Sequence, residues 1–484
     1  MTATDTRSAG SVRSLVPARM DRLPWTRFHW TVVLGLGVSW ILDGLEIQMV
    51  SANGFAKQLH MNSVEVGLTG TVYLVGQVFG ALVFGRLSDR LGRRRFFIIT
   101  LAIYLIGSGV AGFAFSPWFL WVFRFIAGMG IGGEYTAINS AIDEIIPSHY
   151  RGRVDIAING TYWGGAAIGA AANLYLLQQP TLVSTGWGWR IGFFIGPVLG
   201  LIIIYLRRNI PESPRWQLTH GHQQEAEENV DRIEREVEEE SGRKLERLPD
   251  SKAIEVTPSE SIPFRQVAHV FLRLYPKRTF VGLAMMITQS FLYNAIFFSY
   301  ALVLQNFYKI PNGATGLYFF PFAIGNLVGP LVLGPLFDTI GRRRMIFATY
   351  AIAGIVLAVS GALFQAGALN AVTQTIFWCV SFFFASAGAS SAYLTVSETF
   401  PLQVRGQAIS YFFSIGQLVG AFAPTIFGAL VGNGSSRAPL AFGDYFGAAM
   451  MIVGGLVALI FGIDAERKSL EDITDINFMA KAPR

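Results

Sequence analysis

The sequence GRLSDRLGRRR, Gly85–Arg95, occurs a second time in altered form as GPLFDTIGRRR, Gly334–Arg344. The copies begin 249 residues apart in a chain of 484, and both keep two glycines, one aspartate and three arginines in register. Each copy lies between apolar runs of membrane-spanning length, so each is expected to be a short basic loop between two membrane helices. Topology alone accounts for the arginines, but it does not account for the repeated Gly-x3-Asp-x2-Gly spacing. The spacing indicates a membrane protein made of two similar halves.

A second set of residues repeats at nearly the same distance. The residues Glu144, Pro147, Arg151 and Gly152 recur 254 positions later as Glu398, Pro401, Arg405 and Gly406. Two independent repeats with nearly equal offsets are strong evidence of an internal duplication.

The composition excludes an ordinary soluble domain. Hydrophobic residues make up 52% of the chain and charged residues only 14%, a balance typical of proteins that are solvated by a bilayer. The net charge of +6 does not predict a nucleic-acid partner, because most basic residues lie in loops on one predicted membrane face. The single cysteine, Cys379, excludes an intrachain disulfide and makes a cysteine metal site implausible. We expect no metal site and no cofactor.

Twelve apolar runs, each near the roughly 20 residues that cross a bilayer, follow a polar N-terminal segment. They are residues 28–50, 64–85, 96–115, 118–142, 154–177 and 187–205, and then 280–304, 315–337, 345–363, 371–396, 408–431 and 442–463. The arginine-rich loops share one side with the N-terminal segment, so the positive-inside rule puts both termini in the cytoplasm. The sequence therefore predicts an all-α membrane protein with twelve transmembrane helices in two pseudo-symmetric six-helix halves.

The predicted domains follow from these runs. They are a cytoplasmic N-terminal tail (1–27), an N-terminal six-helix bundle (28–206), a cytoplasmic linker (207–277), a C-terminal six-helix bundle (278–464) and a cytoplasmic C-terminal tail (465–484). The N-terminal tail has no cleavable-signal pattern.

The linker contains a candidate amphipathic helix. Residues 225–240 are dense in glutamate, and Ala226, Val230, Ile233 and Val237 recur at helical spacing. One narrow stripe of this helix is therefore apolar and the rest is solvated. Such a helix either braces the two halves in one state or serves as a solvated spacer.

The basic loop motif resembles that of the major facilitator superfamily, in which it follows the second and eighth of twelve helices. The string PESPRW, Pro211–Trp216, and the pattern Arg124-x3-Gly128-x-Gly130-x-Gly132 are similar to strings of the sugar porter branch. Two other strings resemble different branches. Asp43-Gly44-Leu45-Glu46 resembles aromatic-acid:proton symporters, and Gly132-Gly133-Glu134 resembles metabolite:proton symporters. The resemblance leaves the substrate class open.

Ionisable residues inside the predicted helices are costly in hydrocarbon and mark candidate sites. Glu46 and Arg124 match the acid and the partner arginine of proton-coupled sugar porters, so the resemblance implies that they couple transport to protons. Asp43 lies three residues before Glu46 on the same helical face and joins this proton-coupling set. The alternative is a static ion pair that fixes helix packing.

A second set of residues is predicted to bind the solute. Gln289 and Asn294 match amide positions that hold sugar hydroxyls in the sugar porters, and an amide both donates and accepts hydrogen bonds. The predicted set is completed by Glu134, Tyr293, Tyr162, Tyr393 and Gln417. Glu134 either contacts a cationic or hydroxylated solute or forms a hydrogen bond within its own bundle. Thr288, Tyr393 and Ala166 depart from the sugar-porter pattern.

A third set is predicted to form an inner gate. Aspartates at helix exits accept hydrogen bonds from loop arginines or from the N–H groups of a helix N-terminus. The resemblance implies that such contacts hold the gate shut in the outward-open state. The predicted gate residues are Asp89, Arg93, Glu144, Arg151, Asp338, Arg342, Glu398 and Arg405.

Together these features predict a secondary transporter that moves a small organic solute, sugar-like or another metabolite, by alternating access. Proton symport is the expected coupling. ATP is not the expected energy source, because the sequence has no Gly-x4-Gly-Lys-Ser/Thr loop. Organic or aromatic acid:proton symport, proton-coupled efflux of organic cations and a non-transporting nutrient sensor remain as alternatives. No assembled catalytic set indicates an enzyme. We expect a monomer in the plasma (inner) membrane whose partners are the solute, protons and the lipid bilayer.

Overall fold

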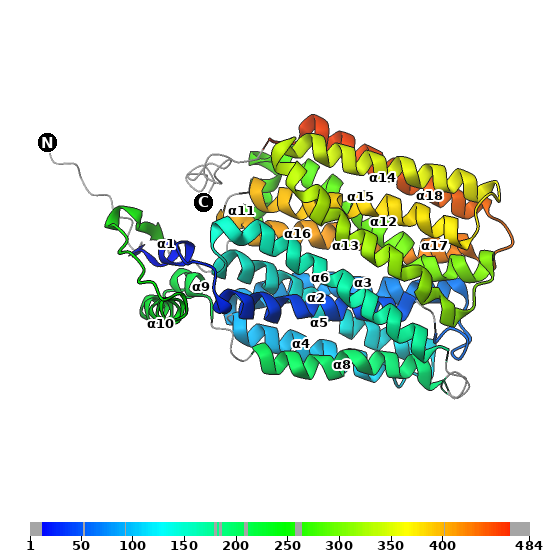
Figure 1. The fold of residues 1–484 in the computed structure, drawn as a ribbon, viewed down its shortest axis with the longest axis horizontal. Helices are drawn as coiled ribbons and strands as arrows, with labels where there is room; N and C mark the ends of the chain where they lie inside the picture. The colour runs from blue at the N-terminus through cyan, green and yellow to red at the C-terminus, as the bar shows by residue number, and fades with distance from the viewer. Residues whose placement is uncertain are drawn as a thin grey trace.

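The computed structural model describes residues 12–51, 54–91, 93–178, 182, 186–207, 212–256, 264–400 and 402–464. Figure 1 shows a long bundle of roughly parallel helices with a smaller group of elements at one end. The helices of the first half are α2 (Arg27–Ser51), α3 (Ser63–Leu91), α4 (Arg93–Ala111), α5 (Pro117–Ile145), α6 (Ser148–Leu176) and α8 (Trp187–Arg207). Those of the second half are α12 (Pro276–Tyr308), α13 (Thr315–Thr339), α14 (Arg342–Gln365), α15 (Ala371–Thr399), α16 (Leu402–Ala421), α17 (Ala423–Val431) and α18 (Ala438–Phe461).

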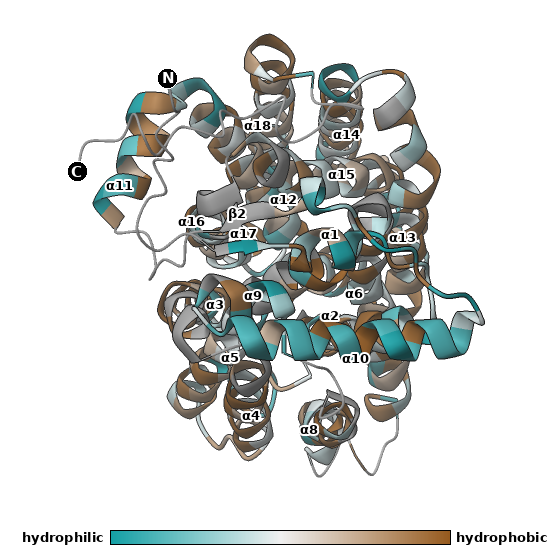
Figure 2. Ribbon diagram, turned by 90° about the vertical axis from the view of Figure 1, so that its left-hand side faces the viewer, coloured by the Kyte–Doolittle hydropathy of each residue, from teal (hydrophilic) through white to brown (hydrophobic). Residues whose placement is uncertain are grey.

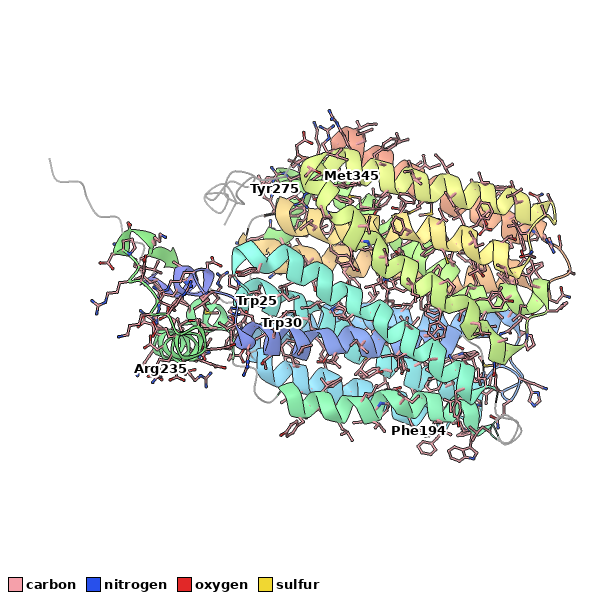
Figure 3. All side chains as sticks on the ribbon, viewed as in Figure 1. Trp25, Trp30, Phe194, Arg235, Tyr275 and Met345 are labelled. Carbon is pink, nitrogen blue, oxygen red and sulfur yellow. The ribbon has the colours of Figure 1, made fainter. Side chains whose placement is uncertain are left out.

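Most of these helices are suited to a bilayer. Within the described residues, nine helical spans are long and apolar enough to cross a membrane, with α16 and α17 counted as one span. The other three long bundle helices, α4, α5 and α6, run beside them, and the apolar part of α4 is the shorter segment Phe96–Ala111. Large apolar side chains such as Leu34, Ile106 and Leu201 are exposed on the bundle. Figure 3 shows side chains projecting from its outer surface along its length, Phe194 among them. An apolar exterior of this kind is stable against lipid.

The two halves pack by the same scheme. In the first half α3 packs on α5, α2 on α6, and α4 on both α5 and α8. In the second half α13 packs on α15, α12 on α16, and α14 on both α15 and α18. The halves meet where α6 packs on α13, α3 packs on α16 and α17, and α2 packs on α12. This repetition agrees with the repeats in the sequence.

The predicted run at 408–431 is interrupted. The helix ends at Ala421 and restarts as α17 at Ala423, with Pro424 in its first turn. Proline has no N–H to donate to the carbonyl four residues earlier, and its ring crowds that carbonyl, so an uninterrupted helix is disfavoured there. The break lies against α3, where a Cβ added at Gly67 would collide with the carbonyl oxygen of Pro424.

The described parts of the N-terminal tail and of the linker fold together at one end of the bundle. We call this unit, residues 12–21 and 212–256, the linker cap. It contains β1 (Val12–Ser14) paired antiparallel with β2 (Ile254–Val256), α1 (Val16–Asp21), α9 (Pro214–Thr219), α10 (Gln223–Ser241) and the short helix η1 (Asp250–Lys252). The chain then returns through α11 (Phe264–His269) and η2 (Val270–Leu274), and η3 (Asn312–Ala314) precedes α13 at the opposite end. Residues 12–21 of the tail are therefore part of the fold.

Helix α10 lies across the bundle end with a mostly hydrophilic surface (Figure 2). Its buried positions include the predicted stripe of Ala226, Val230, Ile233 and Val237, and it packs on α9, α1 and α2. The helix is thus amphipathic and lies on the first half of the bundle.

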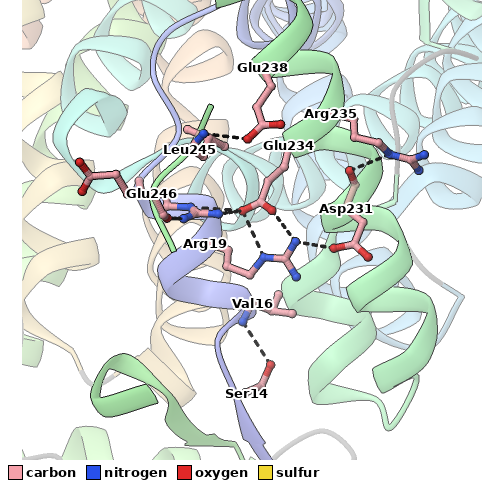
Figure 4. Close-up of polar contacts among 10 residues, drawn as sticks. Ser14, Val16, Arg19, Asp231, Glu234, Arg235, Glu238, Leu245 and Glu246 are labelled. Carbon is pink, nitrogen blue, oxygen red and sulfur yellow. Dashed lines mark hydrogen bonds and ion pairs between the residues drawn. The ribbon is translucent and has the colours of Figure 1, made fainter. Parts of the chain in front are cut away.

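Ion pairs fasten α1 to α10 (Figure 4). Arg19 Nη2 lies 2.5 Å from both Asp231 Oδ1 and Glu234 Oε2, and Arg22 Nη2 lies 2.5 Å from Glu234 Oε1. Burial by itself lowers the pKa of Arg19, but its hydrogen bonds and charge interactions with Glu234 and Asp231 outweigh burial and raise the pKa above its ordinary value. Arg19 therefore remains charged and holds the N-terminal helix on the linker helix.

Candidate functional site

A cavity of about 150 Å³ lies between the two halves. We call it the central cavity. Its walls come from α2, α3, α5 and α6 of the first half and from α12, α13, α15 and α16 of the second. It is lined by Trp40, Asp43, Ile47, Gln77, Tyr135, Gly160, Tyr162, Trp163, Gln289, Ser290, Tyr293, Asn294, Pro330, Ser386, Ala389, Ser390, Tyr393, Phe413 and Gln417. Aromatic rings, amides and hydroxyls predominate, which suits a small solute with both apolar and hydrogen-bonding faces.

A chain of hydrogen bonds runs across this cavity from one half to the other. Asn294 Nδ2 donates to Ser290 Oγ (3.2 Å), and Ser290 Oγ donates to Gln417 Oε1 (2.8 Å). Gln417 Nε2 then donates to Gln77 Oε1 across the interface (2.8 Å), and Gln77 Nε2 donates to Asp43 Oδ1 (3.2 Å). The amides of the second half are thereby connected to a carboxyl group of the first.

Asp43 is buried and accepts hydrogen bonds from three side chains. Besides Gln77, the hydroxyl of Tyr73 donates to Oδ1 at 2.5 Å and the hydroxyl of Tyr135 donates to Oδ2. The donors come from α3 and α5, so side chains of these two helices hold the carboxyl group in place.

Glu46 and Arg124 form an ion pair that is closed off from the cavity. Both side chains are 0% exposed, and Arg124 Nη1 donates to Glu46 Oε1. The other carboxyl oxygen accepts from Ser108 Oγ at 2.6 Å and from the Tyr104 hydroxyl at 3.2 Å. The guanidinium also lies 3.9 Å from the centre of the Tyr73 ring. Tyr73 therefore contacts both the ion pair and Asp43.

Three polar residues of α2 meet side chains of α5. Ser39, Asp43 and Glu46 are four and three residues apart, which places them on one helical face. Ser39 Oγ donates to Glu134 Oε2, and the other two residues meet Tyr135 and Arg124 as described. The interface between α2 and α5 is thus a line of polar contacts through the first half.

Most residues predicted to bind the solute line the central cavity. They are Gln289, Asn294, Tyr293, Tyr162, Tyr393 and Gln417. Glu134 is not one of the lining residues; it lies buried beneath the cavity wall and accepts the hydrogen bond from Ser39. The sequence reading did not select Gln77, Tyr135, Ser386 or Ser390. Gln77 could have been predicted, because a single amide side chain within an apolar run marks a candidate site.

The proton-coupling set divides in the structure. Asp43 lines the central cavity, whereas Glu46 and Arg124 lie behind the wall and are paired with each other. Their coupling role stays a prediction.

The predicted gate is only partly described. The side chains of Asp89, Arg93, Arg151, Asp338, Glu398 and Arg405 lie outside the described residues. Glu144 and Arg342 are half-buried near the linker-cap end of α5 and α14.

The opposite end of the bundle is tied shut by contacts between the halves. Ser63 Oγ donates to the Gly432 carbonyl at 2.7 Å, and Gln178 Nε2 donates to the Gly313 carbonyl at 3.2 Å. The hydroxyls of Thr71 and Thr425 are 2.8 Å apart. These contacts hold the two halves together at this end.

Known transporters are similar to this chain over nearly its whole length. The family model described as "Sugar (and other) transporter" matches residues 40–476. The niacin transporter NiaP of Acinetobacter baylyi (strain ATCC 33305 / BD413 / ADP1) is 24% identical over 466 residues, which cover 94% of this chain and 99% of NiaP. The inner membrane metabolite transport protein YdjE of Escherichia coli (strain K12) is 26% identical over 485 residues, which cover 96% of this chain and 99% of YdjE.

The fold is also that of a solved transporter. A structure of the proton:xylose symporter XylE from E. coli, bound to 6-bromo-6-deoxy-D-glucose, matches with a TM-score of 0.71 at 18% identity over 92% of this chain and 98% of XylE. This match confirms the predicted all-α fold of twelve transmembrane helices in two pseudo-symmetric halves. The protein is an integral multi-pass transporter of small metabolites rather than an enzyme. It belongs to the sugar (and other) transporter family of the major facilitator superfamily.

Proposed function

We propose that this protein is a proton-coupled transporter of a small, ring-bearing, hydrogen-bonding metabolite that works by alternating access. The observation that carries the proposal is the hydrogen-bond chain from Asn294 through Gln417 and Gln77 to Asp43. A solute that hydrogen-bonds to the amides of the second half must rearrange this chain, because each amide group has a limited number of donors and acceptors. Solute binding is thereby linked to the carboxyl group of Asp43.

In this proposal the coupled proton binds at the neighbouring Glu46–Arg124 ion pair. Protonation of Glu46 removes its charge and releases Arg124, while Tyr73, which touches both Arg124 and Asp43, passes the change to the cavity wall. Loss of the proton after the solute leaves lets the pair form again and resets the carrier. The positions of these residues support this assignment. Glu46 and Asp43 lie on one face of α2, and Arg124 lies opposite them on α5.

The orientation follows the basic loops. The linker cap and both termini are cytoplasmic, the chain divides at 28–206 and 278–464 into two bundles, and the protein is a monomer in the plasma (inner) membrane. In this orientation the end closed by the Thr71–Thr425 contact is the outer one, so the described conformation faces the cytoplasm or is occluded.

The charge of the residues that line the cavity limits the class of solute that fits. Asp43 is the only charged residue among the described residues that line the cavity, and this set includes no lysine or arginine. Such a lining favours a neutral solute, for example an aromatic amide or a hydroxylated ring, over an anion that would face Asp43 unpaired. The rings of Trp40, Tyr135 and Trp163 offer faces on which a planar solute can stack.

Organic-acid:proton symport is the second candidate. The relative named as a niacin transporter favours it, because niacin carries a carboxylate and an aromatic ring. In this case Asp43 must be protonated when the acid binds, which again requires proton symport.

Transport by purified protein in liposomes tests the coupling. Glu46→Gln mimics the protonated acid, so it retains exchange of labelled for unlabelled solute but loses uphill uptake driven by an imposed pH gradient. Asp43→Asn is the matched comparison on the same face and is expected to have the smaller effect on coupling. Uphill, pH-driven uptake by Glu46→Gln would exclude Glu46 as the coupling acid.

A thermal-shift screen tests the solute class. Nicotinamide, nicotinate and xylose serve as a neutral aromatic amide, an aromatic acid and a hydroxylated ring. A ligand at 100 times its Kd stabilises the folded protein by about 2.7 kcal/mol, which is a readily measured shift. Stabilisation by nicotinate alone would replace the first candidate with the second.

The gate is tested separately from the site. Asp89 stabilises the closed inner gate in this proposal, so Asp89→Asn lowers transport more than it lowers solute binding. Asp338→Asn has the weaker effect, because its loop has Thr339 where the first loop has Arg90. Equal losses of binding and flux in Asp89→Asn would instead place that residue in the solute site.

A further inference from the structure

The second half contains a smaller cavity that takes no part in the central one. It has a volume of about 10 Å³ and is enclosed between α12, α14, α15 and α18. We call it the C-terminal pocket; it is lined by Ile296, Ser299, Val303, Phe364, Gln374, Trp378, Leu440 and Asp444. This volume is about what one water molecule requires.

Two groups in this pocket have no hydrogen-bond partner among the described residues. Asp444 is 4% exposed, and no described residue donates a hydrogen bond to its carboxyl group or forms an ion pair with it. The indole Nε1 of Trp378, itself 4% exposed, has no hydrogen-bond acceptor within the described part of the chain. A buried donor and a buried acid thus face the same water-sized space.

The other polar residues of the pocket already have partners. Gln374 Nε2 donates to Ser360 Oγ at 3.0 Å, and Gln374 Oε1 accepts from the Tyr308 hydroxyl at 3.2 Å. Ser299 Oγ donates to the Ala295 carbonyl at 2.6 Å. The unsatisfied hydrogen-bonding capacity therefore belongs to Asp444 and Trp378.

The charged and titratable groups nearby do not neutralise Asp444. On the described parts of the four surrounding helices and their caps, those at this end are Arg437, Tyr308, Lys309, Tyr445 and Cys379. Lys309 does not line the pocket, and its Nζ donates to the Asn306 carbonyl at 2.7 Å. Arg437 does not line the pocket. Its Nη1 donates to the Phe364 carbonyl at 3.1 Å, and its guanidinium lies 5.1 Å from the centre of the Phe364 ring. An ionised Asp444 is thus an uncompensated buried charge, which is far more costly than a neutral carboxylic acid.

The pocket occupies the place in the second half that the Glu46–Arg124 pair occupies in the first. The offset of 254 residues that relates Glu144 to Glu398 also relates Arg124 to Trp378. The Glu46–Arg124 pair lies among α2, α4, α5 and α8, which pack as α12, α14, α15 and α18 do. In the second half an indole replaces the guanidinium, and the acid comes from α18.

We infer that the C-terminal pocket is a second proton-binding site, in which Asp444 is a neutral carboxylic acid at neutral pH and one water molecule joins it to Trp378 Nε1. A neutral acid has an O–H donor and a carbonyl acceptor, so it satisfies a bridging water that also accepts from the indole. The proposed site binds a proton and needs no solute, so its proton binding does not depend on which metabolite the carrier moves.

The pH dependence of unfolding tests the inference. Unfolded aspartate releases its proton above a pH of about 3.9, whereas folded Asp444 keeps its proton, so each unit of pH above that value favours the unfolded chain tenfold through this group. Between pH 5 and pH 7 the unfolding constant in mixed micelles should rise about 100-fold more in the wild type than in Asp444→Asn. The other acids contribute equally to both proteins. Equal pH dependence in both would overturn the inference.

Infrared spectroscopy gives a measurement that does not depend on equilibrium unfolding. The wild type at pH 7 should show a protonated-carboxyl band that is absent from Asp444→Asn. In Trp378→Phe, which removes the N–H and keeps an aromatic ring, the band should remain but shift as the acid loses its bridged donor. If Asp444→Asn does not fold, the shift in Trp378→Phe carries the test. An unshifted band would exclude the water-bridged pair, and stabilisation by sodium that Asp444→Asn abolishes would show a cation site instead.

Discussion

Helices α5 and α15 occupy matching places in the two halves but pack differently. The offset of 254 residues that joins the repeated glutamates pairs Gly128 with Phe382 and Gly132 with Ser386. On α5 a Cβ at Gly128 would collide with the Tyr73 carbonyl, and a Cβ at Gly132 would collide with the Gln77 carbonyl. Helix α3 therefore lies directly on α5, with no side chains between the two backbones at these positions.

On α15 the matching positions carry side chains that form the cavity wall or pack against it. The Phe382 ring packs edge-on against Tyr293 at a centroid distance of 4.8 Å, and Ser386 lines the central cavity. The first half thus uses close backbone packing to hold Asp43 and the Glu46–Arg124 pair, whereas the second half supplies a neutral wall of amides, hydroxyls and rings. The same scaffold holds buried charge in one half and lines the central cavity with neutral groups in the other.

The largest expected loss of stability comes from removing one partner of the buried Glu46–Arg124 pair in the first half. Arg124→Ala leaves Glu46 buried without its partner and should destabilise the protein by about 3–5 kcal/mol. Equilibrium unfolding in mixed micelles measures this loss. The double variant Arg124→Ala/Glu46→Gln removes the uncompensated charge, so it should be more stable than the single variant. A double variant that is no more stable would show that packing, not charge, explains the loss.

Placing the α15 residue on α5 tests the packing difference. Gly132→Ser puts a side chain against the Gln77 carbonyl and should cost about 1–3 kcal/mol of folding free energy, as overpacking does. Gly164→Ala is the matched control, because nothing lies within 4 Å of a Cβ built there. It should be neutral or stabilising, since alanine favours helix over glycine. Equal costs for the two changes would contradict the contrast between α5 and α15.

Each residue of the neutral cavity wall in the second half should contribute modestly to solute affinity. Gln289→Ala, Asn294→Ala and Gln417→Ala each remove one or two hydrogen bonds, and about 0.5–1.5 kcal/mol per bond corresponds to a roughly 2- to 12-fold loss of solute affinity. Isothermal titration with the transported solute measures it. Gln417→Ala should also alter the pH dependence of binding, because Gln417 reaches Asp43 through Gln77. Unchanged affinity in all three variants would move the solute site away from this wall.

The smallest effect is expected in the linker cap, which packs on the first half. Arg19→Ala removes a half-buried ion pair with Glu234 and should cost about 0.2–1 kcal/mol, less at high salt. Arg27→Ala is the control, because Arg27 is 92% exposed and lies 3.8 Å from Glu240. Proteolysis of the N-terminal segment reports the release of α1 more sensitively than global unfolding does. Equal protease sensitivity in both variants would argue against a role for the Arg19–Glu234 contact.

The sequence predicted the helices well because their signals are local. Membrane-spanning runs are identified by length and hydropathy, and the stripe of α10 by its period, so neither requires knowledge of distant contacts. Other features depend on partners far along the chain. The pairing of β1 with β2, for example, joins segments about 240 residues apart.

The candidate site was partly predictable for the same reason. Glu46 and Arg124 were selected because ionisable groups are rare and costly inside membrane helices. Gln289 and Asn294 were selected because they match amide positions of the sugar porters. Asp444 was overlooked although it follows the same rule, since it lies near the start of the last apolar run and resembles a loop residue in the sequence.

The sequence alone determined the number of halves, the membrane class and the chemical types available inside the bundle, because repeats, hydropathy and composition are properties of the chain itself. Only the tertiary structure decided which polar groups meet. It put Asp43 in the cavity and Glu46 behind the wall, although three residues separate them, because a side chain's surroundings depend on the helices packed against its face. It also joined Gln77 to Gln417, 340 residues away, since contacts between halves form only when the two bundles dock.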